Sequence, residues 1–223
     1  RGTIGGPQGD NLTPVDIVKF ASAYATWLQE HNPGRKLTVV IGRDARISRE
    51  MVNVSIEGTL LGYGIDVINV GLCTTPGVEM AVTHHKADGG IIITARHNPR
   101  QWNALKLLDG NGEFLDAVQG ARVLKLAAQD GLEYPDVDGI GKVGSRENFD
   151  ARHIETALAL PLVDVPAVKA AGFKAVVDAV NSVGGIVIPR LLREMGVEVV
   201  ELNCEPTGEF AHNPEPLPEN LKE

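Results

Sequence analysis

The sequence predicts an α/β protein: a layered domain with a mixed, largely parallel sheet flanked by helices, followed by the start of a second, similar α/β domain. Two observations lead to this fold class. Short apolar runs rich in β-branched residues alternate with amphipathic stretches of helical length up to residue 129, which is the element order of a parallel α/β sheet. The same alternation resumes after residue 150, so we expect domains at 1–150 and 151–223.

The first helix has the clearest start signal in the chain. Thr13 is placed as the N-cap, Pro14 takes the first helical position, and Asp16 lies in the first turn, where the helix dipole favours an anion. The elements expected in this domain are helices at 14–30, 49–61, 76–87 and 115–129, and strands at 37–42, 65–70 and 91–93. Glycine, proline and charge become dense after residue 130, which predicts a linker up to about residue 148.

The second domain is expected to begin with a helix at 151–160 and a strand at 172–179. A glycine-rich loop at 181–185 then leads into a helix that ends near residue 195, before a strand at 197–202. This loop contains neither a Gly-x-Gly-x-x-Gly motif nor the Gly-Lys-Ser/Thr of a P-loop, so it does not predict a nucleotide site.

Bulk composition excludes some classes of function. The 223 residues carry a net charge of -8 with no clustered basic face, which argues against nucleic-acid binding. No apolar run approaches the length of a membrane span, and no charged-then-apolar leader opens the chain. The two cysteines, Cys73 and Cys204, are far apart and lack metal-ligand spacing, which fits a cytoplasmic protein. The sequence leaves the oligomeric state open.

Polar side chains of several kinds appear together where the apolar strand 91–93 ends. Pro99 directs the residue before it away from helical geometry, so this segment is expected to be a stiff loop. Residues 94–99 hold two groups that can move protons or donate to a phosphate. The alternation of Lys106 with its leucine neighbours predicts a second short strand that returns a cation to the loop. The polar residues of this stretch are Thr94, Arg96, His97, Asn98, Asn103 and Lys106.

Two other strand ends point to the same edge of the predicted sheet. Arg43, Asp44 and Arg46 follow the strand at 37–42, and the carboxyl ends of parallel strands form the ligand side of such a sheet. Thr74 and Thr75 precede a helix, where they can either donate to a phosphate or only cap the helix. The arginine cluster fits a structural ion-paired turn as well as it fits direct contact with a ligand.

The central loop resembles the active-site loop of the α-D-phosphohexomutases, the family of phosphoglucomutase, phosphomannomutase and phosphoglucosamine mutase. The family pattern is Thr-Ala-Ser-His-Asn-Pro followed by Asn-Gly-x-Lys, and this chain has Thr-Ala-Arg-His-Asn-Pro, then Asn103 and Lys106. Gly-Arg-Asp-x-Arg at 42–46 and the pair Arg1-Gly2 also match the family, although Arg1 alone would be read as a frayed terminus. The resemblance covers almost the whole chain and slightly favours the phosphoglucosamine mutase type.

The resemblance implies an intramolecular phosphotransferase that interconverts hexose or hexosamine 1-phosphate and 6-phosphate through a phosphoenzyme and a bisphosphate. It implies a phosphosugar partner, Mg²⁺ and a hexose 1,6-bisphosphate activator, although this chain is expected to bind neither cofactor at full strength. The family's metal ligands are the phosphoserine and aspartates expected beyond Glu223, so no metal ligand is expected here. It assigns catalytic positions to Arg96, His97, Lys106 and Arg1, and phosphate-loop positions to Thr94, Asn98, Asn103, Arg43 and Arg46.

Arg96 is the serious departure from the family pattern, because it occupies the position of the serine that carries the phosphate. A guanidinium has no oxygen to esterify and stays protonated, so it cannot be the carrier. Three interpretations remain. The first is the N-terminal part of a mutase whose serine has been replaced, by design or by natural variation, and which is expected to be inactive because of Arg96 and because the later domains are absent. The others are a non-catalytic relative that binds phosphosugars or other anions, and an unrelated α/β binding domain.

Overall fold

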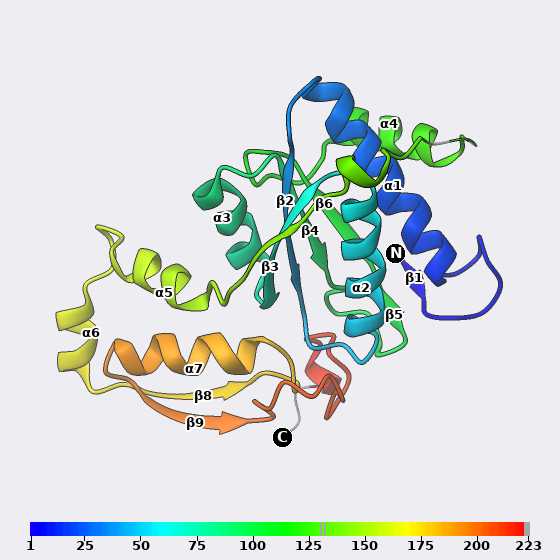
Figure 1. Ribbon diagram of the computed structural model, residues 1–223. Helices are drawn as coiled ribbons and strands as arrows, with labels where there is room; N and C mark the ends of the chain where they lie inside the picture. The colour runs from blue at the N-terminus through cyan, green and yellow to red at the C-terminus, as the bar shows by residue number, and fades with distance from the viewer. Residues whose placement is uncertain (130, 132, 221–223) are drawn as a thin grey trace.

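The computed structural model describes residues 1–129, 131 and 133–220, and its first domain is built on one five-stranded sheet. The strand order is β6-β4-β2-β3-β7, and every neighbouring pair is parallel except β4 with β6 (Figure 1). These strands are β2 (Thr38–Arg43), β3 (Asp66–Leu72), β4 (Gly89–Ile93), β6 (Leu105–Leu108) and β7 (Val143–Arg146). The predicted mixed, largely parallel sheet is confirmed.

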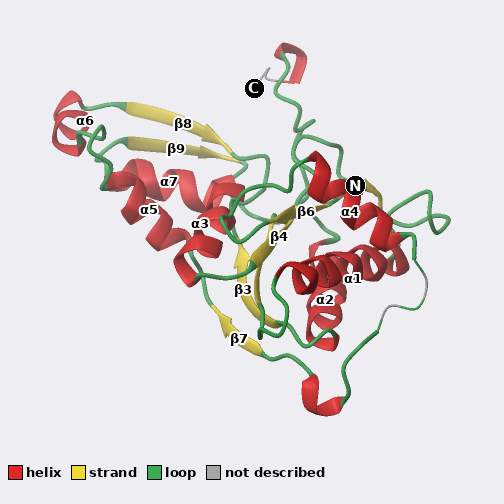
Figure 2. Cartoon of the chain, turned by 90° about the horizontal axis from the view of Figure 1, so that it is seen from above, coloured by secondary structure: helices red, strands yellow, loops and turns green. Residues whose placement is uncertain are grey.

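Helices cover both faces of this sheet, as Figure 2 shows from above. One core cluster packs α1, α2 and α4 against one face, and a second cluster packs α3 and Phe149 against the other. The four helices are α1 (Pro14–His31), α2 (Arg49–Gly62), α3 (Thr75–His85) and α4 (Ala117–Ala127). Strand β4 lies between both layers and is buried at every position, which explains its uninterrupted apolar run.

The cap predicted for α1 is present, whereas α2 begins without a side-chain cap. Thr13 accepts from the backbone of Asp16, whose carboxylate in turn accepts from the backbone of Thr13. Ser48 occupies the N-cap position of α2 without a capping hydrogen bond, because its hydroxyl accepts from Asn103 instead.

The linker prediction is wrong for residues 143–146. They form β7, which pairs with β3 and extends the sheet at its edge, after a short helical turn η1 (Val137–Gly139). A short, partly exposed edge strand gives only a weak apolar alternation, and Gly144 interrupts it further.

The second unit contains a two-stranded parallel sheet with helix α7 packed on one face. Its elements are α5 (Asp150–Leu158), α6 (Val165–Ala171), β8 (Lys174–Asp178), α7 (Gly184–Glu194) and β9 (Glu198–Leu202), followed by the turn η2 (Pro218–Asn220). The sequence did not predict α6. After β9 the chain turns back to the first domain, so that the red segment of Figure 1 lies below the ends of β2 and α2.

Candidate phosphate site

The candidate site is the loop between β4 and β6, and a small second sheet fixes its far end. Strand β5 (Trp102–Asn103) pairs antiparallel with β1 (Gly2–Thr3), and the amide of Ile4 donates to the carbonyl of Gln101 at 2.8 Å. This pairing brings the N-terminal arginine beside the loop, as the family resemblance implies for an Arg-Gly pair.

Arg46 holds the base of the loop. Its side chain is fully buried and its Nε donates to Asp44 at 3.2 Å. The remaining guanidinium nitrogens donate to four loop carbonyls at 2.7–2.9 Å, those of Arg96, Asn98, Pro99 and Trp102. Because its N–H groups donate to these carbonyls, Arg46 stabilises the shape of the loop and is not available to a ligand.

Asn103, Asn98 and Thr94 also serve the shape of the loop. The amide of Asn103 is fully buried and donates to Ser48 at 2.9 Å. Asn98 donates from its side chain to the Ala95 carbonyl at 2.7 Å. The hydroxyl of Thr94 accepts from the amide of Arg96 at 3.2 Å, so it is occupied within the loop.

Arg43 points to a different part of the molecule. Its guanidinium donates to Asn69 at 3.3 Å and to Glu50 at 3.1 Å, over the start of α2. Thr74 caps α3 by accepting from the amide of Gly77 at 3.2 Å. The structure therefore places neither residue on the open face of the loop.

The open face of the loop carries Arg96 and His97, which are both exposed. Arg96 has a φ of 53°, a left-handed conformation that non-glycine residues rarely adopt and that costs of order 1–3 kcal/mol. Such strain concentrates at functional sites, and here it turns the Arg96 and His97 side chains outward while the Arg96 carbonyl stays on Arg46.

Lys106 approaches the same region from β6. Its Nζ is buried and has no hydrogen-bond partner among the residues that the structure describes. Burial lowers the pKa of Lys106, and the nearby positive charge of Arg96 lowers it further. A buried ammonium without a partner is costly, so this geometry favours an anionic ligand next to Lys106.

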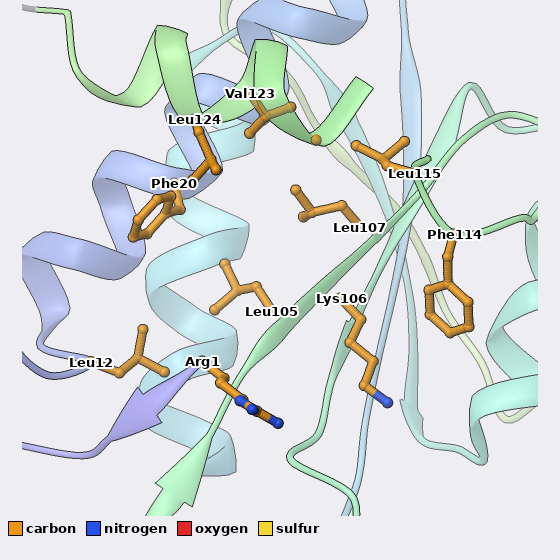
Figure 3. Close-up of a pocket in the computed structure, with 11 residues that line it drawn as sticks. Arg1, Leu12, Phe20, Leu105, Lys106, Leu107, Phe114, Leu115, Val123 and Leu124 are labelled. Carbon is orange, nitrogen blue, oxygen red and sulfur yellow. The ribbon is translucent and has the colours of Figure 1, made fainter. Parts of the chain in front are cut away.

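Arg1 and Lys106 line one pocket of about 400 Å³. Figure 3 shows the two cationic side chains extending to the same side, with Leu107, Val123 and Leu124 on the opposite side. His97 does not line this pocket. The structure therefore brings Arg1 and Lys106 together, and Arg96 is near enough for its charge to lower the pKa of Lys106.

Two residues near Lys106 were not identified from the sequence. Phe114 lies with its ring centroid 5.7 Å from Nζ, and Glu79 of α3 is close enough for its charge to raise the Lys106 pKa. Burial raises the pKa of Glu79 itself. Neither residue stands in a motif, since only the packing of α3 and of the β6 turn brings them to the site.

The described residues do not fit Mg²⁺. Among them no group of three His, Cys, Asp or Glu side chains could hold a metal ion. Two carboxylates lie near the loop: Asp44, which accepts from Arg46, and Glu79, which faces the charges of Lys106 and Arg96. A metal ion placed at residue 96 would meet the positive charge of a guanidinium.

Comparison with known proteins decides the family. Residues 1–132 match the model of phosphoglucomutase/phosphomannomutase alpha/beta/alpha domain I, and residues 151–223 match that of domain II. The chain belongs to the phosphoglucomutase/phosphomannomutase family. The fold class and the resemblance predicted from the loop motif are thereby confirmed, and the third interpretation, an unrelated binding domain, is excluded.

Individual relatives agree with this assignment. The chain is 40% identical over 224 residues to a phosphoglucomutase/phosphomannomutase of Thermococcus kodakarensis, covering 99% of this chain and 48% of the relative. It is 32% identical to a phosphoglucosamine mutase of Saccharopolyspora erythraea over 92% of this chain and 45% of the relative. A crystal structure of a "putative phosphomannomutase" from Thermus thermophilus superposes with a TM-score of 0.82 at 26% identity, over 99% of this chain and 48% of that one.

The chain spans about half the length of the curated relatives it matches. Among the described residues no helix of this family member is long and apolar enough to cross a membrane.

Proposed function

We propose that this chain provides the phosphate-binding half of a hexose or hexosamine phosphate phosphotransferase. The observation that carries the proposal is the buried Lys106 ammonium, which lacks a hydrogen-bond partner among the described residues and shares a pocket with Arg1. A phosphoryl group placed between these cations would supply the missing acceptor.

The reaction we propose for this site is the interconversion of sugar 1- and 6-phosphates through a phosphoenzyme and a bisphosphate. Lys106 is suited to hold and release a proton at Nζ, because its lowered pKa brings the neutral form closer to physiological pH. The exposed His97 imidazole is the second proton-transfer group of the loop. Arg1 would bind and orient the phosphate.

Arg96 blocks one step of this reaction. The phosphoenzyme step needs an oxygen at position 96, and a guanidinium offers none. We therefore propose that the chain binds the phosphosugar but does not turn it over.

The test restores serine at this position. Arg96→Ser and, as a matched control, Arg96→Ala are made in this chain extended to the full length of its relatives. Both are assayed for interconversion of hexose 1- and 6-phosphates with Mg²⁺ and glucose 1,6-bisphosphate. Turnover by Arg96→Ser alone is the expected result, and equal rates for Arg96→Ser, Arg96→Ala and the parent would reject the mutase proposal.

A non-catalytic anion-binding role is the second candidate, and Arg96 is the residue that favours it. Arg1, Arg96 and Lys106 place three cations around one loop, which suits a permanent phosphate receptor. Calorimetry of this chain with glucose 6-phosphate should show binding that weakens as salt is added. Lys106→Met should abolish the signal, and a flat trace for the parent chain would reject phosphosugar binding altogether.

A further inference from the structure

The second unit touches the base of the candidate site through residues 205–213, here called the returning segment. Gly208 of this segment is buried against the turn after β2, and its φ of 79° lies in the left-handed region. A Cβ at this position would come 1.9 Å from the carbonyl oxygen of Ala45, so only glycine allows this approach. The Arg49 side chain also donates to the Thr207 carbonyl at 3.4 Å.

Phe210 of the returning segment covers Arg46. The guanidinium carbon lies 5.0 Å from the centroid of the Phe210 ring, within the range of a cation–π contact. This is the same guanidinium that donates to the four carbonyls of the 94–103 loop. The ring therefore excludes water from the group that holds the loop in shape.

The second unit fixes the returning segment at three points. The amide of Gly208 donates to the Asn181 carbonyl, and the Asn181 side chain donates to the Glu209 carbonyl, both at 2.9 Å. His212 Nε2 lies 2.8 Å from the carboxylate of Asp178, at the end of β8. The position and orientation of Phe210 are thus set by the βα loop of the second unit.

We propose that Phe210 is a positioning residue, through which the second unit sets the shape of the 94–103 loop by covering the Arg46 guanidinium. A docked ring keeps the guanidinium in a low-dielectric environment, where its bonds to the loop carbonyls are strong. When the ring is removed, water competes for the same N–H groups, and Arg96 and His97 lose their fixed positions. The expected effect on phosphosugar affinity rests on the proposed function, whereas the effect on loop order does not.

Amide hydrogen exchange in this chain tests the proposal. Phe210→Ala should raise the exchange rates of the bonded amides at Asn98 and Trp102 by about fivefold, the ratio that corresponds to a cation–π contact of about 1 kcal/mol. Amides of β8 and β9 should keep their rates. Phe210→Trp, which restores an aromatic face, should return the loop amides to the parent rates.

Phe173→Ala is the matched control, because Phe173 belongs to the same unit, directly precedes β8 and is 56% exposed, with no described contact to the loop. In Phe173→Ala, the amides of Asn98 and Trp102 should exchange at the rates of the parent chain. Two outcomes would overturn the proposal: unchanged loop amides in Phe210→Ala, or equal rises in the loop and in β8–β9, which would mean that Phe210 only supports its own unit. Glucose 6-phosphate calorimetry on the same variants reports the proposed function separately, since a parent chain that does not bind leaves the exchange result intact.

Discussion

The base and the face of the 94–103 loop differ in how their polar groups are satisfied. At the base, Arg46 and Asn103 are fully buried and donate to named protein acceptors. On the face, Arg96 and His97 are exposed, and the Lys106 ammonium is buried without a hydrogen bond to any described residue. Groups that are satisfied internally maintain a fold, whereas a group that lacks an acceptor is available to a ligand. The comparison predicts that substitutions at the base lower stability and that substitutions on the face change binding.

The largest effect is expected for Arg46→Ala. This change removes bonds to four carbonyls and leaves the buried Asp44 carboxylate without its cation, which costs about 3–5 kcal/mol. Urea unfolding followed by circular dichroism measures the loss. Arg43→Ala is the matched control, and its ion pair with the largely exposed Glu50 is worth only about 0–1 kcal/mol. Equal losses in both variants would contradict the structural role of Arg46.

A smaller loss is expected for Asn103→Ala. The substitution leaves Ser48 and the Ala104 amide without their Asn103 partner, and a buried polar group left unsatisfied costs about 1–3 kcal/mol. The free energy of unfolding should fall in this range. Asn111→Ala on the exposed turn before Phe114 provides the comparison and should change stability by less than about 0.5 kcal/mol.

Lys106 should respond to pH in opposite directions for stability and for binding. Its pKa is lower in the folded chain than in the unfolded chain, so stability should rise as the pH increases through the folded value. Anion affinity should fall over the same range, because the ammonium is lost. Lys106→Met should remove both dependences and change stability at neutral pH by no more than about 1 kcal/mol. Calorimetry measures the anion affinity, and urea unfolding measures the stability, between about pH 7 and pH 10. This range approaches the ordinary lysine pKa of about 10.4.

The smallest effect on stability is expected for His97→Ala. The side chain is exposed, and such surface substitutions stay within about 0.5 kcal/mol. In the serine-restored, extended protein the same change should reduce turnover by about 10²–10⁴-fold, the usual contribution of a general acid or base. Unchanged turnover would remove His97 from the proton-transfer roles.

The sequence predicted the strands of the first domain well, because burial on both faces of β2 and β4 produces continuous apolar runs. It also predicted the short β6 strand from the alternation around Lys106. Strand β7 was missed, since its four residues include Gly144 and Ser145 and give little apolar signal.

The roles within the arginine cluster could not be separated from the sequence alone. In the sequence, an arginine that contacts a ligand cannot be told from one that contacts backbone carbonyls, because both follow the end of a strand. Only the geometry distinguishes Arg46, which points under the loop, from Arg43, which points to Asn69. The sequence also could not identify Glu79 as a neighbour of Lys106, because helix α3 comes near Lys106 only through tertiary packing.

The antiparallel pairing of β6 with β4 decides which side chains β6 presents to the site. Lys106 lies opposite Ile92, while Leu105 and Leu107 face the apolar layer under α1 and α4. A deletion that slid β6 by a single position would exchange these environments, burying an ammonium among leucines and presenting a leucine to the anion. The register of β6 must therefore be kept for Lys106 to reach the site.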